Sequence, residues 1–196
     1  MSWTDEHARL EAIARRIEPS VRLVAKEGPF WRAVGVLAAG ATLGGIGVRT
    51  FLADYATAIG PLQGYPRHWS AARVESLLVH EARHTRQARW CGLGIHPWLG
   101  LPLFAALYLA LPLPAGGALL RFWFELDADR AAWRHALASG AAPDHVRARA
   151  AEFASRVCSG HYGWPVPRRV GAAWFARAAE RAIAAHAPAA RSDRVV

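Results

Sequence analysis

The chain has 196 residues, of which 53% are hydrophobic and 20% are charged, and its formal net charge is +9. This composition excludes a disordered chain, and the length suits one domain with a sizeable hydrophobic core over residues 1–196. The excess of basic over acidic residues would suit binding to an anionic lipid surface or an acidic substrate, but the arginines are scattered through helical segments. No nucleic-acid recognition motif accompanies them, so we expect no specific nucleic-acid partner.

The N-terminal residues and the cysteines bear on the compartment. Residues 1–6 are acidic, and no apolar stretch follows them as it would in a secretory signal. The two cysteines, Cys91 and Cys158, form no CxxC pair and no disulfide framework, which slightly favours a reducing compartment. We therefore expect a cytoplasmic or membrane-associated protein without a signal peptide.

The first segment, residues 3–18, is predicted to be an amphipathic helix. Leu10, Ile13 and Ile17 fall on one stripe of it, and Pro19 ends the pattern. We prefer packing on a protein core to adsorption on a membrane, because the polar face carries charges of both signs.

Residues 33–48 are uncharged and contain five glycines, at positions 35, 40, 44, 45 and 47. The run is shorter than the roughly 20 residues of a spanning helix, and glycine disfavours any helix. We therefore predict strands here, continuing through residues 48–55, with turns at Gly60-Pro61 and at residues 64–66. A short sheet directly before the next helix would offer an edge strand with which an extended peptide could pair.

The next helix is predicted over residues 71–90, with Ser70 as its N-cap and the glycine-rich residues 91–94 as its stop. It contains the sequence His-Glu-Ala-Arg-His at residues 80–84. With nine His and nine Glu in the chain, random placement gives about 0.02 matches to His-Glu-x-x-His, so chance does not account for the motif.

This motif has the spacing of a zinc hydrolase. Residues four positions apart share one face of a helix, so His80 and His84 can both bind one cation. Glu81 lies beside that face, where its carboxylate can take a proton from a metal-bound water without binding the metal itself. The alternative is a polar face with two unrelated histidines. The apolar residues 77–79 argue against it, because they predict a buried helix.

An apolar segment follows, with no charged residue at positions 90–120. Residues 98–120 are long enough to span a membrane, but Pro102, Pro112 and Pro114 would break a continuous helix. Three structures remain open: a buried helical hairpin, a re-entrant or interfacial segment, and one irregular span. We favour burial or interfacial docking, and exposed apolar surface here could bind a membrane or a partner.

Three helices are predicted in the rest of the chain. The first covers residues 117–138 and ends before Gly140, and the second opens at Pro143 and ends near residue 159. An aromatic loop at residues 161–167 leads to the last helix, and the tail from residue 187 is expected to fray. Three residues of the last helix are expected to face inward: Val170, Trp174 and Ile183.

A catalytic zinc needs a third protein ligand, which leaves one coordination position for water. One known arrangement places a histidine six residues after His84, but position 90 is Trp. Glu125 and Asp129 lie four residues apart on one face of the helix predicted over residues 117–138. Glu125 can bind the metal, and Asp129 can accept the second ring N–H of a ligand histidine. The alternative is that these acidic residues only form ion pairs with neighbouring arginines. The presence of the His-Glu-x-x-His motif in the same chain makes this alternative less favoured.

Together the two motifs resemble those of the gluzincins, zinc peptidases that include the thermolysin-like and membrane CAAX-prenyl-protease-like families. The residues that carry the resemblance are His-Glu-Ala-Arg-His at 80–84 and Glu-Leu-Asp-Ala-Asp at 125–129, and it covers about residues 48–138. It implies an α+β, mostly helical zincin-like domain with a small sheet before the motif helix. It also implies Zn²⁺ bound by His80, His84 and Glu125, with Glu81 as the general base.

These features favour a zinc-dependent metallopeptidase that acts on a peptide or protein substrate. The alternative is a catalytically idle, zinc-stapled module that binds a membrane surface or a partner. Glu81 argues against it, because a purely structural site has no use for a base. Hydrolysis also needs a donor to the carbonyl oxygen, and His161 and Tyr162 in the aromatic loop are the candidates. The loop could instead have a purely structural role as a cap on the core, and this alternative to the donor role remains open.

Overall fold

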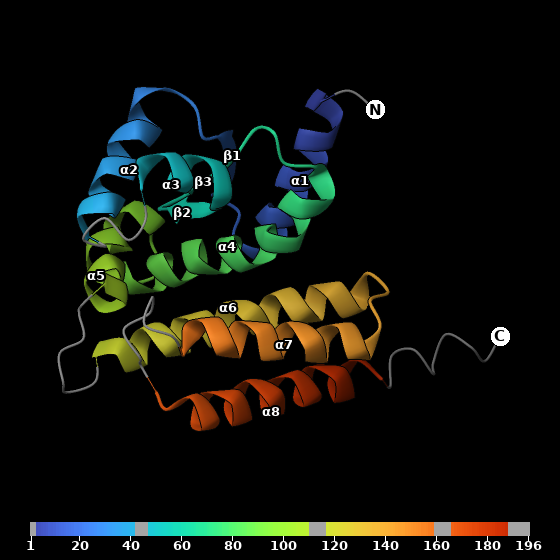
Figure 1. Cartoon of the computed structure of the whole chain (residues 1–196). Helices are drawn as coiled ribbons and strands as arrows, with labels where there is room; N and C mark the ends of the chain where they lie inside the picture. Colours follow the sequence, from blue (N-terminus) through green and yellow to red (C-terminus); the bar gives the residue numbers. More distant parts are fainter. Residues whose placement is uncertain (1–2, 42–46, 110–116, 159–165, 188–196) are drawn as a thin grey trace. The chain divides into compact units, whose positions relative to one another are not determined.

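The computed structural model describes residues 3–41, 47–109, 117–158 and 166–187 (Figure 1). The chain divides into two compact units, Met1–Leu101 and Pro102–Val196. Helices dominate, and a small three-stranded mixed sheet precedes the helix that carries the motif, which confirms the predicted fold class. One domain for the whole chain stays a prediction.

The first unit contains the sheet. It begins with helix α1 (Trp3–Ile17), which confirms the first predicted helix. The next elements are β1 (Arg22–Ala25), α2 (Gly28–Ala41), α3 (Val48–Asp54), β2 (Thr57–Ile59) and β3 (Leu62–Tyr65). The strand order is β1-β3-β2, with β1 parallel and β2 antiparallel to the central strand β3. A turn at Gly60, where φ is +55°, and Pro61 joins β2 to β3, as predicted. The turn predicted at residues 64–66 is wrong in part, because Gly64 and Tyr65 belong to β3.

The strands predicted over residues 33–55 are wrong, because α2 and α3 occupy this part of the chain. Residues 42–46 lie outside the described residues. Glycine in a helix costs about 1 kcal/mol relative to alanine, but here packing outweighs it. Trp31 on α2 is only 4% exposed, and a Cβ at Gly35 would press on Val48 and Phe51 of α3. The glycine therefore allows the two helices to approach closely.

Helix α4 (Ala71–Cys91) packs on α1 and on the sheet. The shared core consists of Leu10, Ala14, Val21, Leu23, Tyr65, Trp69, Val74, Leu78 and Ala82, with Ile13 and Ile17 partly buried against it. Near the other end of α4, Arg89 forms an ion pair of 2.7 Å with Glu18, which is only 2% exposed. Ser20 donates to the same Glu18 oxygen from its backbone N–H and its hydroxyl. These contacts fix the position of α4 along its length.

Helix α5 (Pro97–Leu109) forms the first half of the apolar segment, with Pro102 inside it. Its start lies against the end of α4, because a Cβ at Gly100 would overlap the backbone oxygen of Ala88. Along α5, Leu99 is 64% exposed, whereas Phe104 is 8% exposed. Among the described residues, no helix is both long and apolar enough to cross a membrane.

The second unit is built from α6 (Gly117–Ala138), α7 (Pro143–Val157) and α8 (Arg168–His186), which pack on one another. The predicted start and end of α6 are confirmed, and Gly140 after it adopts a φ of +89°. The largest buried side chains of this core are Phe122, Leu126, Trp133, Leu137, Val146, Phe153, Val157, Val166 and Phe175.

The inward face predicted for the last helix is partly wrong. Trp174 and Ile183 are partly buried against the core, but Val170 is 41% exposed. The fully buried position belongs instead to Phe175, and Ala178 and Ala182 continue the same stripe. The aromatic loop at residues 161–165 and the tail from residue 188 lie outside the described residues.

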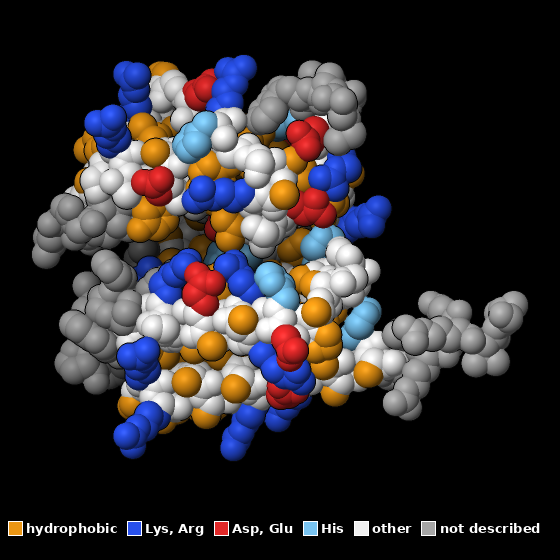
Figure 2. All heavy atoms as spheres, turned by 45° about the vertical axis from the view of Figure 1, so that its right-hand side comes forward, with side chains coloured by type: hydrophobic (Ala, Val, Ile, Leu, Met, Phe, Trp, Pro, Cys, Tyr) orange, Lys and Arg blue, Asp and Glu red, His pale blue; other side chains and the backbone are white. Residues whose placement is uncertain are grey.

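Charged side chains are spread over the surface of each unit. On the face shown in Figure 2, basic side chains stand among Asp and Glu side chains. Several of them form exposed ion pairs, such as Arg147 with Glu180 at 2.7 Å. This spread agrees with the scattered arginines of the sequence.

Candidate metal centre

Helix α4 positions both histidines of the motif. Ser70 begins the helix, since its hydroxyl accepts a hydrogen bond of 3.4 Å from the backbone N–H of Arg73. Val79, which precedes the motif, and Ala82 within it are buried in the first unit. His80 and His84 are each 7% exposed, so the motif lies on a buried face as the sequence predicts.

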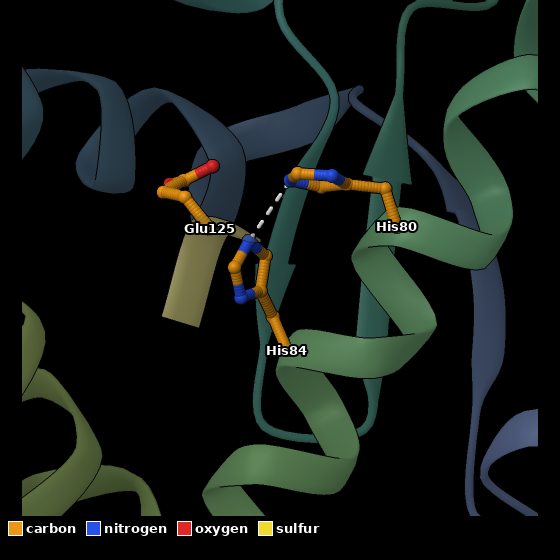
Figure 3. A group of neighbouring side chains, drawn as sticks. All are labelled: His80, His84 and Glu125. Carbon is orange, nitrogen blue, oxygen red and sulfur yellow. Dashed lines mark hydrogen bonds between the residues drawn. The ribbon is translucent and has the colours of Figure 1, made fainter. Parts of the chain in front are cut away.

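The two imidazoles point toward one another (Figure 3). Nε2 of His80 and Nε2 of His84 are 3.0 Å apart, and the ring planes are inclined by 82°. Two nitrogens bound to one tetrahedral zinc at the usual bond length would be about 3.3 Å apart. The separation of the two Nε2 atoms therefore already fits binding to one ion.

Gln87 fixes the orientation of the second histidine. Nδ1 of His84 donates a hydrogen bond of 2.8 Å to Oε1 of Gln87, one helical turn further along α4. Because Nδ1 carries the proton, the neutral ring presents the lone pair of Nε2 toward His80. Gln87 is only 1% exposed, so water does not compete for this bond. Sequence reasoning missed Gln87, although its position at i+3 from His84 was a readable signal.

Glu125 lies on α6 and is 2% exposed. The hydroxyl of Tyr108 on α5 donates a hydrogen bond to its Oε1. The guanidinium of Arg121 lies over the Tyr108 ring at 4.8 Å from its centroid. Tyr108 therefore orients the carboxylate, and it is a second supporting residue that the sequence did not reveal.

One ligand atom from each of His80, His84 and Glu125 lies within 4.8 Å of the other two. All three residues are buried. Two imidazole nitrogens and one carboxylate oxygen are a donor set that suits a divalent transition metal such as zinc. The structure thus contains a candidate metal site with the three residues that the sequence predicts as ligands.

Glu81 is half-buried and faces a small pocket in the first unit, between α4 and the sheet. Among the described residues its carboxylate accepts no hydrogen bond. Its charge acts on Lys26: burial lowers the pKa of Lys26 to about 7, and the negative charge of Glu81 acts in the opposite direction. Glu81 follows His80 directly in the chain, and its role as a general base stays a prediction.

Lys26 follows β1 and is 6% exposed. Its Nζ donates to the backbone oxygen of Phe51 at 3.1 Å and to the hydroxyl of Thr57 at 2.6 Å. The same atom lies 3.6 Å from the centroid of the Phe51 ring and 5.6 Å from that of Trp31. This lysine, which directly follows β1, therefore contacts α2, α3 and the strand β2.

The structure does not establish the predicted roles of the three remaining site residues. His161 and Tyr162 lie outside the described residues, so their role as oxyanion donors stays a prediction. Asp129 is 1% exposed on α6. The acceptor role predicted for it is filled at His84 by Gln87, and for His80 it stays a prediction.

Comparisons with known proteins add no family: no family model, no curated protein and no solved structure matches the chain. The resemblance to gluzincins therefore depends on the two motifs and on the ligand group that they form.

Proposed function

We propose that this chain is a zinc-dependent metallopeptidase in which His80, His84 and Glu125 hold the metal. The observation that carries the proposal is the pair of Nε2 atoms 3.0 Å apart, with the His84 tautomer set by Gln87. A buried carboxylate completes a donor set of three, which leaves a coordination position open as in catalytic zinc sites. This set of three ligands is the one that the gluzincin resemblance implies.

When bound, zinc would polarise the scissile carbonyl and acidify a water molecule. Glu81 would accept the proton of the attacking water and return it to the nitrogen of the leaving amine. Its half-buried position supports this role, because the carboxylate reaches the pocket without a competing hydrogen bond among the described residues. The buried imidazoles and the sheet behind α4 would keep bulk water away from the reacting groups.

The test combines zinc content with cleavage of a quenched fluorescent peptide library. The native protein should contain one zinc and cleave peptides. Glu81→Gln should keep the zinc and lose turnover by about 10²–10⁴-fold. His84→Ala and Glu125→Ala should both lose zinc, because each removes one of three ligands.

Glu75→Gln is the matched control, because Glu75 lies on the same helix and pairs with Arg9 at 2.8 Å instead of facing the pocket. It should cleave at the native rate. Full zinc occupancy in Glu125→Ala would remove Glu125 from the ligand set. A zinc-loaded native protein that cleaves no peptide would favour the alternative function, a zinc-stapled binding module.

A further inference from the structure

Gln63 is a buried amide without a hydrogen-bond partner among the described residues. It lies in the central strand β3 and is 3% exposed. Neither its Nε2 nor its Oε1 is hydrogen-bonded to a described residue. Leaving such a group unpaired is unfavourable for folding, and most buried polar atoms in proteins are paired. The position therefore needs an explanation that the core of this unit does not supply.

The amide lies next to the proposed base. Gln63 and Glu81 line the same pocket, whose other walls are mostly apolar, among them Leu23, Trp69 and Leu77. The space between these side chains is about 10 Å³, close to the room that one water molecule needs. One small polar group, such as a single carbonyl or N–H, fits there.

The backbone of Gln63 is not available to a ligand. It pairs with Leu23 of β1 on one side and with Ala58 of β2 on the other, because β3 is the central strand. A substrate can therefore meet this part of the sheet through a side chain alone. Of the side chains of β3 that line the pocket, Tyr65 already has a partner, His7, at 2.7 Å.

We propose that Gln63 is a substrate-positioning residue that pairs with a peptide unit of the substrate beside Glu81. The chemical class follows from the two groups that share the pocket. The Gln63 amide can donate to a peptide carbonyl or accept from a peptide N–H, whichever of the two enters the pocket. An anionic ligand would be repelled by Glu81 in apolar surroundings, so a neutral amide is favoured over a carboxylate or a phosphate.

The inference deepens the proposed peptidase function and depends on it for the identity of the substrate. It also accounts for a buried amide that no described residue of the chain pairs with. Replacing it by an apolar side chain of similar length should therefore stabilise the fold while it weakens binding.

The composition of the chain makes a direct measurement practical. The sequence has no asparagine and two glutamines, Gln63 and Gln87, so a ¹⁵N correlation spectrum of the full chain shows two side-chain amide pairs. Gln63→Met removes one pair and thereby assigns both. The probe is N-acetyl-leucine N-methylamide, a neutral secondary amide, and the control ligand is 4-methylpentanoate, an anion with the same branched side chain.

The Gln63 pair should shift saturably with the amide probe and should not shift with the anion, while the Gln87 pair moves little with either. Gln63→Met should melt about 2 °C or more above the native protein, because it removes an unpaired buried amide. In peptide cleavage, Gln63→Met should keep its zinc and lose kcat/KM roughly tenfold.

The outcomes separate this inference from the proposed function. If the native protein cleaves peptides and Gln63→Met cleaves them equally well, the role of Gln63 is refuted and the peptidase remains. If no peptide is cleaved, the titration alone decides, and a saturable shift still supports amide binding at Gln63. A Gln63 pair that does not move up to tens of millimolar probe, or a variant that melts below the native protein, overturns the inference. Both results would indicate an amide that is satisfied within the folded chain.

Discussion

Replacing Gln87 by methionine tests how the candidate metal centre is oriented. The variant keeps the length of the side chain and removes the acceptor of the 2.8 Å bond from Nδ1 of His84. Gln87 is 1% and His84 7% exposed, so water cannot replace the acceptor freely. An unsatisfied buried N–H costs about 1–3 kcal/mol, and loss of such a partner behind a ligand histidine usually weakens metal binding about 10–100-fold. We expect an increase of that size in the Kd for zinc.

The assay is competition for zinc with a chromogenic chelator, with melting curves to confirm that each variant is folded. Gln63→Met is the matched control, because it makes the same substitution at the other glutamine of the chain, which bonds no ligand histidine among the described residues. Its Kd for zinc should equal that of the native protein. Gln87→Glu should bind zinc at least as well as the native protein, since a carboxylate also accepts the Nδ1 proton. A folded Gln87→Met whose Kd stays within twofold of the native value would refute the reasoning.

Two further predictions concern the first unit. Burial lowers the pKa of Lys26 to about 7 from its usual 10.5, so between these values the unfolded chain binds a proton that the folded chain does not. The free energy of unfolding should therefore rise with pH above 7, by up to about 1.4 kcal/mol per pH unit, and Lys26→Met should lack this rise in urea unfolding at pH 7.5 and 9. Five large apolar residues at the junction of α4 and α5 are exposed: Trp90, Leu93, Ile95, Trp98 and Leu99. With Arg83 and Arg86 close to Trp90, this surface should bind anionic vesicles, and Leu93→Asn, which tolerates the φ of +56°, should weaken sedimentation with them. Equal recovery of both proteins in the supernatant would remove the membrane surface from the expected partners.

Helix boundaries were predictable where a local residue determines them. The hydroxyl of Ser70 caps α4, Gly140 adopts the left-handed conformation after α6, and Pro143 begins α7. Each of these signals acts within a few residues and depends little on the rest of the fold. The predicted bounds of these helices therefore agree closely with the structure.

Helix α2 could not be predicted in the same way. Its glycines and its lack of charge suggested strands, and no local feature reveals that Trp31 packs over β3. A Cβ at Gly64 would overlap the Trp31 ring, so the helix and the strand are complementary in shape across more than thirty residues of sequence. Such a contact depends on the tertiary arrangement, which overrides the intrinsic preference of glycine.

In the candidate site, too, residues related by local sequence spacing were predictable, and a residue brought in by tertiary packing was not. The ligands were predictable, because His80 and His84 have a fixed spacing on one helix and Glu125 stands in a short acidic motif. Gln87 lies on the same helix and was within reach of the same argument. Tyr108 was not, because its bond to Glu125 joins two helices that no sequence spacing relates.

The composition nevertheless contained a signal for the missed glutamines. The chain has two glutamines, no asparagine and one lysine among 24 basic residues, and these three rare side chains are all buried in the first unit. At Lys26, a compact ammonium fits between the Phe51 oxygen and the Thr57 hydroxyl, where the larger planar guanidinium of arginine would not. Gln87 has a partner in His84, and Lys26 has two oxygen acceptors. Of the three, only the side chain of Gln63 forms no hydrogen bond with a described residue, so it is the one whose role requires a ligand.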